Sequence, residues 1–396
     1  MIRDDFRKYL CPTSGSPDGL EVASALGCWI TDAAGNRYLD WLSGISVCNV
    51  GHRHPEVLRA IREQAEKYLH VMVYGEYVLE PQVAYARALC EIAPMPQPQV
   101  FFTSSGAEAI EGALKVARKH TRRKRFVAFE GSYHGDTFGA LSITGAAGMR
   151  APFEPLLETG FLPFGWEESL AMIDDRTAAV VVEPIQAEGG VRVPPAGFLK
   201  KLRSRCDETG ALLIMDEVQT GLGRTGAMWA CEREGVKPDI LVLAKALGGG
   251  MPLGAFVAGL PLMFTLSVDP PLSHLTTFGG HPVSCAAGLA ALNVLRGQDL
   301  ARHARELGTI AMNILLGLKR AGEIADARGA GLLLGVELDS TDRAEIVVRA
   351  CRHSGLLVGT ALHDPKTIRL VPPLTMTDDE LVRGLDIFTA AITETR

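Results

Sequence analysis

Short, uniformly apolar runs alternate with helical patterns through the middle of this 396-residue chain. The runs are VFFTSS, RFVAFEGSY, TAAVVVEPI, ALLIMDEV, DILVLAK and GAFVAGL, and the helix-like segments among them include GAEAIEGALKVARKH and AGFLKKLRSRCDETG. Strands that are apolar on both faces and separated by helices indicate an α/β fold with a doubly wound, mostly parallel sheet covered on both sides. Ligands of such sheets bind beyond the carboxyl ends of the strands.

Two charged residues stand at the ends of two of these strands. Lys245 closes DILVLAK, just before three glycines, and Asp216 closes ALLIMD. Burying an unpaired charge is costly, and often the group becomes neutral instead. Taken singly, Asp216 fits a turn-capping carboxylate, and Lys245 fits a lysine that reaches solvent from a strand end. One ligand explains both residues: a pyridine aldehyde whose ring nitrogen pairs with Asp216 and whose aldehyde condenses with Lys245.

A cofactor of this kind also carries a phosphate, and the segment FFTSSGAEAIEG offers an anion site. It places Ser105, Gly106 and Ala107 between a strand and a helix, where backbone N–H groups and the helix dipole favour an anion. Ser105 and Glu108 also have capping-box spacing, so helix capping explains the segment equally well. Tyr133, just past RFVAFEG, is a candidate stacking partner for the ring, although a single aromatic residue is more often part of the core.

Composition excludes several other classes of protein. The net charge of −6 and the pI near 6.0 give no reason to expect nucleic-acid or anionic-membrane partners. No apolar run approaches the roughly 18 residues of a membrane helix, and the N-terminal MIRDDFRKYLCPTSG lacks the apolar core of a signal peptide. The eight cysteines are scattered without a C-x-x-C pair, which argues against structural metal and disulfides. We therefore expect a cytoplasmic protein without a metal site.

With these motifs in order, the chain resembles the class III aminotransferases, the pyridoxal-phosphate family that contains the acetylornithine, ornithine and 4-aminobutyrate aminotransferases. The resemblance runs from GCWITDAAGNRYLDWLSGISVCNVGHRHPEV to RLVPPLTMTDDEL, and its most specific stretches are LLIMDEVQTGLGRTG and PDILVLAKALGGGMPLGA. It implies the PLP-dependent transferase type I fold, with a large doubly wound domain and a smaller α+β domain built from both chain ends. We place the small domain at residues 1–45 and 283–396 and the large PLP-binding domain at residues 46–282.

The resemblance also implies roles around the cofactor. Lys245 matches the lysine that forms the Schiff base and then moves the proton between Cα and C4′. Asp216 matches the carboxylate that keeps the ring nitrogen protonated, and Val218 and Tyr133 match the residues on either side of the ring. The other matches are Gln219 near the phenolic oxygen, Ser105, Gly106 and Ala107 at the phosphate, Glu183 as support for the pocket, and Thr277, which reaches the phosphate of the neighbouring subunit's cofactor. The resemblance therefore implies a homodimer with a shared active site.

Four further residues bear on the substrate. Arg369 matches the arginine that binds the α-carboxylate of glutamate or 2-oxoglutarate by a two-pronged contact. Glu188 matches the acid that pairs with this arginine when an ω-amine is bound. Thr276 stands where acetylornithine enzymes usually have serine. Asp136 stands where acetylornithine and 4-aminobutyrate enzymes typically carry an arginine for the far carboxylate, so it predicts donors with a distal ammonium.

The expected function is PLP-dependent transfer of an amino group from an ω-amine of an amino acid or diamine, acetylornithine- or ornithine-like, to 2-oxoglutarate by a ping-pong mechanism. The partners would be an amine donor, a 2-oxo acid acceptor and a second copy of the chain. Three alternatives remain open on the same residues. They are a racemase or aminomutase, a decarboxylating lyase, and a binding or structural protein without catalysis.

Overall fold

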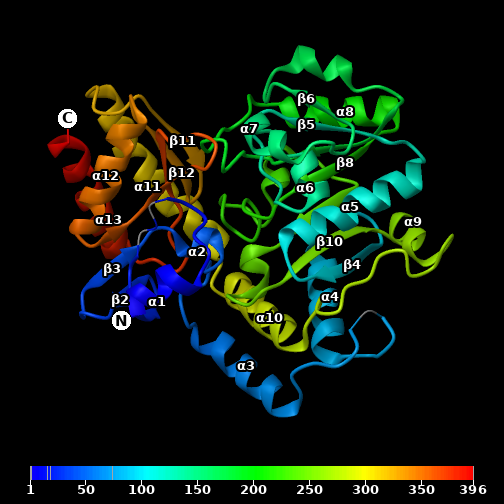
Figure 1. Ribbon diagram of the computed structural model, residues 1–396, viewed down its shortest axis with the longest axis horizontal. Coiled ribbons are helices and arrows are strands. Elements are labelled where there is room, and N and C mark those ends of the chain that lie inside the picture. Colours follow the sequence, from blue (N-terminus) through cyan, green and yellow to red (C-terminus); the bar gives the residue numbers. More distant parts are fainter. Residues whose placement is uncertain (1, 16, 18, 74, 396) are drawn as a thin grey trace.

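A seven-stranded sheet is the largest of three sheets in the computed structural model, which describes residues 2–15, 17, 19–73 and 75–395 (Figure 1). Its strands, in spatial order, are β4 (Pro98–Thr103), β10 (Gly254–Gly259), β9 (Ile240–Leu243), β8 (Leu212–Asp216), β7 (Thr177–Val182), β5 (Arg125–Phe129) and β6 (Thr159–Leu162). The five strands from β9 to β6 are parallel to one another, and β10 is antiparallel to both of its neighbours. The predicted mostly parallel sheet is confirmed.

The reversal of β10 follows from the length of the chain before it. Only residues 244–253 connect β9 to β10, whereas a crossover between parallel strands needs about a dozen residues or more. The chain therefore turns at the carboxyl end of β9 and runs back antiparallel. This turn contains the segment that begins with Lys245.

Both faces of the large sheet are buried, as the uniformly apolar strands require. Alternate residues along β5 illustrate this, because Phe126 and Ala128 belong to one apolar cluster and Val127 and Phe129 to another. One face is covered by α5 (Gly106–Thr121), with α6 (Phe138–Ser142) and α9 (Leu260–Met263) beside it. On the other face lie α4 (Glu80–Ile92) and α8 (Phe198–Thr209). The short α7 (Ala147–Arg150) follows α6.

Two smaller four-stranded sheets complete the fold, and both chain ends lie in this part of the molecule (Figure 1). One sheet joins N-terminal strands to a C-terminal one, since β3 pairs in parallel with β13, Leu39 opposite Leu356. This pairing is what a domain made from both chain ends requires, and the boundaries at residues 45 and 282 stay a prediction. The two sheets consist of β1 (Val22–Leu26), β2 (Trp29–Asp32), β3 (Arg37–Asp40) and β13 (Leu356–Leu357), and of β11 (Asp326–Ala330), β12 (Leu333–Glu337), β15 (Thr367–Leu370) and β14 (Gly359–Thr360).

The remaining helices connect and cover these parts. In the C-terminal part, α11 (Leu300–Arg320), α12 (Thr341–His353) and α13 (Asp378–Glu394) pack on the small sheets. The helix α10 (Pro282–Gly297) connects the parts, because it packs against α4 on one side and α11 on the other, and α3 (Pro55–Lys67) packs on α10. The N-terminal α1 (Ile2–Tyr9) buries none of its residues. Within the described residues, no helix is both long enough and apolar enough to cross a membrane.

A turn with left-handed backbone brings the N-terminal segment to the large sheet. Residues Ser43–Ser46 (α2) have φ values between +44° and +63°, which non-glycine residues adopt only where surrounding contacts hold them. Asp40 supplies such contacts, because its Oδ1 accepts the N–H groups of Leu42 at 2.9 Å and of Ser43 at 3.0 Å. Its Oδ2 pairs with Nε2 of His52 at 2.7 Å.

The Asp40–His52 pair should make the stability of the protein depend on pH. Hydrogen bonds to Asp40 and to the Cys48 thiol raise the pKa of His52 from 6.5 to about 10. A raised folded-state pKa stabilises the protein fully below the unfolded value of 6.5, and the contribution disappears as the pH rises through about 10. We expect His52→Asn to lower the free energy of unfolding by about 2–4 kcal/mol at pH 6.

Urea unfolding of wild type and variant at several pH values measures this effect. The gap between the two proteins should narrow steadily from pH 6 toward pH 10. A gap that stays the same over this range would show that the charge on His52 does not stabilise the fold.

Candidate active site

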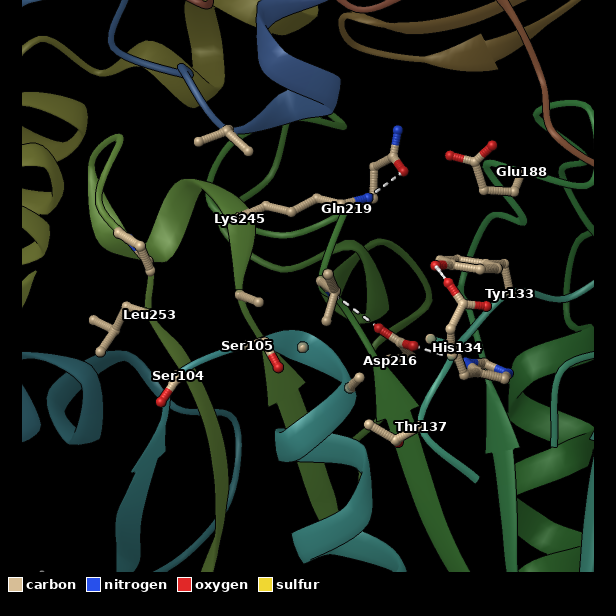
Figure 2. Close-up of a pocket in the computed structure, with 18 of the residues that line it drawn as sticks. Ser104, Ser105, Tyr133, His134, Thr137, Glu188, Asp216, Gln219, Lys245 and Leu253 are labelled. Carbon is tan, nitrogen blue, oxygen red and sulfur yellow. Dashed lines mark hydrogen bonds and ion pairs between the residues drawn. The ribbon is translucent and has the colours of Figure 1, made fainter. Parts of the chain in front are cut away.

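A cavity of about 670 Å³ lies at the carboxyl ends of the parallel strands (Figure 2). Five strand ends contribute one each of the side chains singled out in the sequence: Ser105 after β4, Tyr133 after β5, Glu183 after β7, Asp216 at the end of β8 and Lys245 after β9. Parallel strands deliver their carboxyl ends to one edge of the sheet, which is why residues far apart in the sequence meet here.

Lys245 lies in a turn held in a strained conformation. Its φ is +52°, in the left-handed region that non-glycine residues seldom adopt. Its Nζ donates to Oε1 of Gln219 at 2.7 Å, and Nε2 of Gln219 lies 3.4 Å from Oγ of Ser46 in the left-handed turn. Burial lowers the pKa of Lys245 from 10.5 to about 8. About a tenth of this amine is therefore neutral and nucleophilic at pH 7, far more than for an ordinary lysine.

Asp216 forms a buried ion pair with His134. Oδ2 of Asp216 lies 2.7 Å from Nδ1 of His134, and Oδ1 accepts the N–H of Val218 at 3.0 Å. Burial alone lowers the pKa of His134, but the hydrogen bond and charge of Asp216, together with the charge of Glu183, outweigh it and raise that pKa. This contact ties the ring of His134 to the carboxylate at the end of β8.

His134 was not among the residues predicted to form the site. The sequence contains only a histidine in YHGD that can equally be an ordinary hydrogen-bonded residue. The contact with Asp216 spans 82 residues of sequence and exists only because β5 and β8 both end at this cavity. Within the described part of the chain, Nε2 of His134 is buried without a hydrogen-bond partner.

Glu183 and Tyr133 form the wall beside this pair. Glu183 accepts the backbone N–H of Tyr133 at 3.0 Å and that of Ala187 at 3.2 Å, and burial raises its pKa to about 7. The hydroxyl of Tyr133 donates to Oδ2 of Asp136 at 2.8 Å (Figure 2). Burial and this hydrogen bond raise the pKa of Tyr133, so the phenol stays protonated and available as a donor.

The N-terminus of α5 faces the cavity from β4. Ser105 caps the helix, with its Oγ accepting the N–H of Glu108 at 3.2 Å, so the capping interpretation is correct. Gly106 and Ala107 also line the cavity, and N–H groups of a first helical turn have no acceptor within the helix. A Cβ on Gly106 would come within 3.3 Å of Val218 and Ala244. Helix capping and an anion cradle are thus compatible at this segment.

Glu188 and Arg369 form a second buried ion pair, between Oε1 of Glu188 and Nη1 of Arg369 on β15. Oε2 of Glu188 also accepts the N–H of Leu362 at 3.0 Å, and Nη2 of Arg369 donates to the carbonyl of Thr360 at 3.3 Å. Glu188 lines the cavity, whereas Arg369 lies outside its lining. The pair joins a loop of the large sheet to the C-terminal part of the chain.

Most of the predicted site residues therefore meet at one cavity, and three do not. Thr276 and Thr277 lie between α9 and α10 and do not line the cavity of their own chain. Thr276 accepts the N–H of Gly279 at 3.1 Å, and Thr277 is exposed. The third is Arg369, which pairs with Glu188 but does not itself line the cavity. Across the residues that the structure describes, no group of three histidine, cysteine, aspartate or glutamate side chains is placed to hold a metal ion.

This arrangement has the parts that a pyridoxal phosphate site needs. It combines an amine of lowered pKa, a buried carboxylate, an aromatic wall and a helix N-terminus suited to a phosphate. Fold and site are thus suited to a carbonyl cofactor with a phosphate group, held beside the amine of Lys245.

Comparison with known proteins identifies the family. The family model "Aminotransferase class-III" matches residues 13–392. The acetylornithine aminotransferase of Methanopyrus kandleri is 46% identical to the chain, over 91% of this chain and 90% of that protein. That of Methanosarcina acetivorans is 42% identical, over 97% of this chain and 94% of that protein. The chain belongs to the class III aminotransferases.

Solved structures agree with this assignment. The ornithine aminotransferase of Toxoplasma gondii ME49 has a TM-score of 0.92 at 32% identity, covering 99% of this chain and 94% of that one. An amine transaminase from an uncultivated Pseudomonas species, solved in its PLP-bound form, has a TM-score of 0.91 at 29% identity, covering 98% and 99%. The predicted type I transferase fold and the transaminase class are confirmed, and pyridoxal 5′-phosphate is the cofactor of this family.

Proposed function

We propose that the enzyme transfers the amino group of an ω-amine, carried by an amino acid or a diamine, to 2-oxoglutarate by a ping-pong mechanism. The buried Glu188–Arg369 pair carries this proposal. While Glu188 and Arg369 are paired, the carboxylate of Glu188 balances the charge of the guanidinium. The cavity then accepts a donor that has no carboxylate next to Glu188. When Glu188 turns away, Arg369 is free for the two-pronged binding of a carboxylate. The names of the acetylornithine and ornithine aminotransferase relatives support an ω-amine donor.

Each residue of the cavity has a proposed task in the reaction. Bound pyridoxal phosphate supplies an electron sink for the substrate carbon that loses its proton. Lys245, oriented by Gln219, holds the cofactor before the donor arrives and afterwards carries the proton. Asp216, oriented by His134 and by the N–H of Val218, would hold a proton on the ring nitrogen. Ser105, Gly106 and Ala107 hold the phosphate, and Tyr133 and Val218 enclose the ring, in front of the supporting Glu183.

We further propose a homodimer in which Thr277 of one subunit completes the phosphate site of the other. Thr277 is exposed in the single chain, and the large apolar side chains on its loop are exposed too, namely Leu272 (60%), Leu275 (48%) and Phe278 (57%). Apolar groups exposed together in this way are typical of a surface that a partner covers. A cytoplasmic location accords with eight cysteines that are all free.

A half-reaction tests the proposed chemistry. The enzyme is mixed with ornithine, N-acetylornithine, lysine, 4-aminobutyrate or putrescine without an acceptor, and the absorbance of the bound cofactor is followed. We expect one equivalent of carbonyl product per site and conversion of the cofactor to its amine form. Exchange of the substrate α-proton with solvent, without any carbonyl product, would instead favour a racemase or aminomutase.

Asp136 should select the donor. Its carboxylate lies at the cavity, bonded to the hydroxyl of Tyr133, where it attracts a distal ammonium and repels a distal carboxylate. We expect Asp136→Arg to lower kcat/KM for ornithine and putrescine by about tenfold or more, and to raise it for 4-aminobutyrate. Asp136→Asn is the matched control, because it keeps an acceptor for Tyr133 and removes only the charge. An unchanged order of donors in both variants would rule out this role.

A further inference from the structure

Lys119 anchors the loop that carries Thr277. Its Nζ donates to the backbone carbonyls of Val268 and Pro270, the latter at 3.1 Å, and to Oγ of Ser273 at 3.0 Å. An ammonium group has three N–H donors, so this side chain uses all of them on one loop. Ser273 is itself bonded to the carbonyl of Leu266 at 3.2 Å, which closes the loop on itself.

The helix α5 therefore contacts both the cavity and the loop that carries Thr277. The N-terminus of α5 lines the cavity of its own subunit at Gly106 and Ala107. Lys119 lies thirteen residues later, ~20 Å along the helix at 1.5 Å per residue. From there it holds the segment 268–273, which leads directly into Thr276 and Thr277.

The neighbouring Lys115 contacts the loop more weakly. Its Nζ lies 3.3 Å from Nδ1 of His274 at an exposed position. The pKa of His274 is lowered by burial and by the charge of Lys115, so the ring is neutral and the contact is a single hydrogen bond. Lys119 thus makes three hydrogen bonds to the loop, whereas Lys115, one turn earlier on the same helix, makes one.

We propose that Lys119 is a positioning residue for the partner's active site: by fixing segment 268–273 it places Thr277 against the phosphate of the other subunit's cofactor. The inference rests on the proposed homodimer with a shared site. Since Lys119 acts through Thr277, its loss weakens binding of the cofactor phosphate in the partner and leaves its own subunit's cavity intact. Each α5 helix thereby connects the two active sites of the dimer.

Cofactor affinity of the apoenzyme tests this inference first. We expect Lys119→Met to weaken binding of pyridoxal phosphate about tenfold and to leave binding of pyridoxal, which has no phosphate, unchanged. Lys115→Met, the matched control, should change either affinity less than twofold. Lys119→Met should add no further loss in a Thr277→Val background, because both changes remove the same contact. A general loss of folding would instead affect pyridoxal and pyridoxal phosphate alike.

Heterodimers decide whether the effect acts across the interface. In the first heterodimer, one chain is wild type and the other carries both Lys119→Met and Lys245→Ala. The intact Lys245 is then in the wild-type chain, and the Thr277 that reaches its cofactor comes from the chain that lacks Lys119. In the second heterodimer, one chain carries Lys119→Met and the other carries Lys245→Ala. The intact Lys245 is then in the Lys119→Met chain, and the Thr277 that reaches its cofactor comes from the chain that keeps Lys119. We expect a tenfold weaker pyridoxal phosphate affinity at Lys245 only in the first heterodimer.

Each other result has a definite meaning. A defect only in the second heterodimer would show that Lys119 acts within its own subunit, and no defect in either would show that it does not act on the cofactor; both overturn the proposal. Wild-type affinity in the Thr277→Val homodimer would overturn the shared site itself, and with it the basis of the inference. Ser273→Ala, which removes one of the three acceptors, provides a milder variant with the same expected pattern if Lys119→Met does not fold.

Discussion

Replacing Lys245 with alanine is expected to abolish transamination and to leave the fold intact. Among the described residues, the side chain of Lys245 has one hydrogen-bond partner, Gln219. Burial already disfavours its charge, so its removal relieves desolvation and opens a small space. In the proposed mechanism, the variant lacks both the covalent attachment of the cofactor and the proton carrier. Loss of the acid–base role alone lowers kcat by roughly 10²- to 10⁴-fold, and loss of the attachment adds to this.

Steady-state rates and circular dichroism of Lys245→Ala measure the two parts of this expectation. Lys237→Ala is the control, because Lys237 is exposed just before β9 and takes no part in the cavity. The control should keep wild-type rates. Sustained turnover by Lys245→Ala at more than a thousandth of the wild-type rate would mean that another group carries the proton.

Removing the carboxylate of Asp216 should harm both stability and catalysis. Asp216→Ala leaves the buried ring of His134 without the partner of its Nδ1 and removes the main group that offsets the effect of burial on its pKa. Breaking a buried ion pair by removing one side costs about 3–5 kcal/mol. In the proposed site, the ring nitrogen of the cofactor would also lose a neighbouring negative charge, which is worth roughly 1–3 pKa units, or about 10- to 1,000-fold in the population of its protonated form.

Asp216→Asn separates these two effects. The amide keeps the size of the side chain and an oxygen for the N–H of Val218, but has no charge. We expect kcat to fall as in Asp216→Ala, with a smaller loss in the urea unfolding free energy. The double variant Asp216→Asn/His134→Asn should lose less unfolding free energy than the sum of the losses in the two single variants, because the two residues interact directly. Additive losses would show that the two side chains do not depend on each other.

The sequence predicts the cavity well because the fold determines where the strand ends meet. Lys245 and Asp216 were recognised as charges at the ends of apolar strands, and the parallel sheet necessarily brings such ends together. The limits of prediction from the sequence also have physical causes. His134 follows Tyr133 in the chain, and only the strand order, with β7 between β5 and β8, shows that it can reach Asp216.

Contacts between the two parts of the chain are beyond the reach of local patterns. Glu188 and Arg369 are 181 residues apart, and without the family resemblance each is an ordinary charged residue. The Ser105 segment shows a different limit, because a capping box and an anion cradle require the same residues. The anchoring of the Thr277 loop by Lys119 has no sequence signal, since its acceptors are two backbone carbonyls and a serine hydroxyl.

Borohydride reduction of the enzyme with its cofactor, followed by peptide mass spectrometry, tests the role of Lys245 most directly. Reduction fixes the cofactor permanently to the amine that holds it. We expect one pyridoxyl phosphate group per chain, on the peptide that contains Lys245, and none after the enzyme has first been converted by an amine donor. Label on a different lysine, or no covalent label in an enzyme that still turns over, would contradict the role of Lys245.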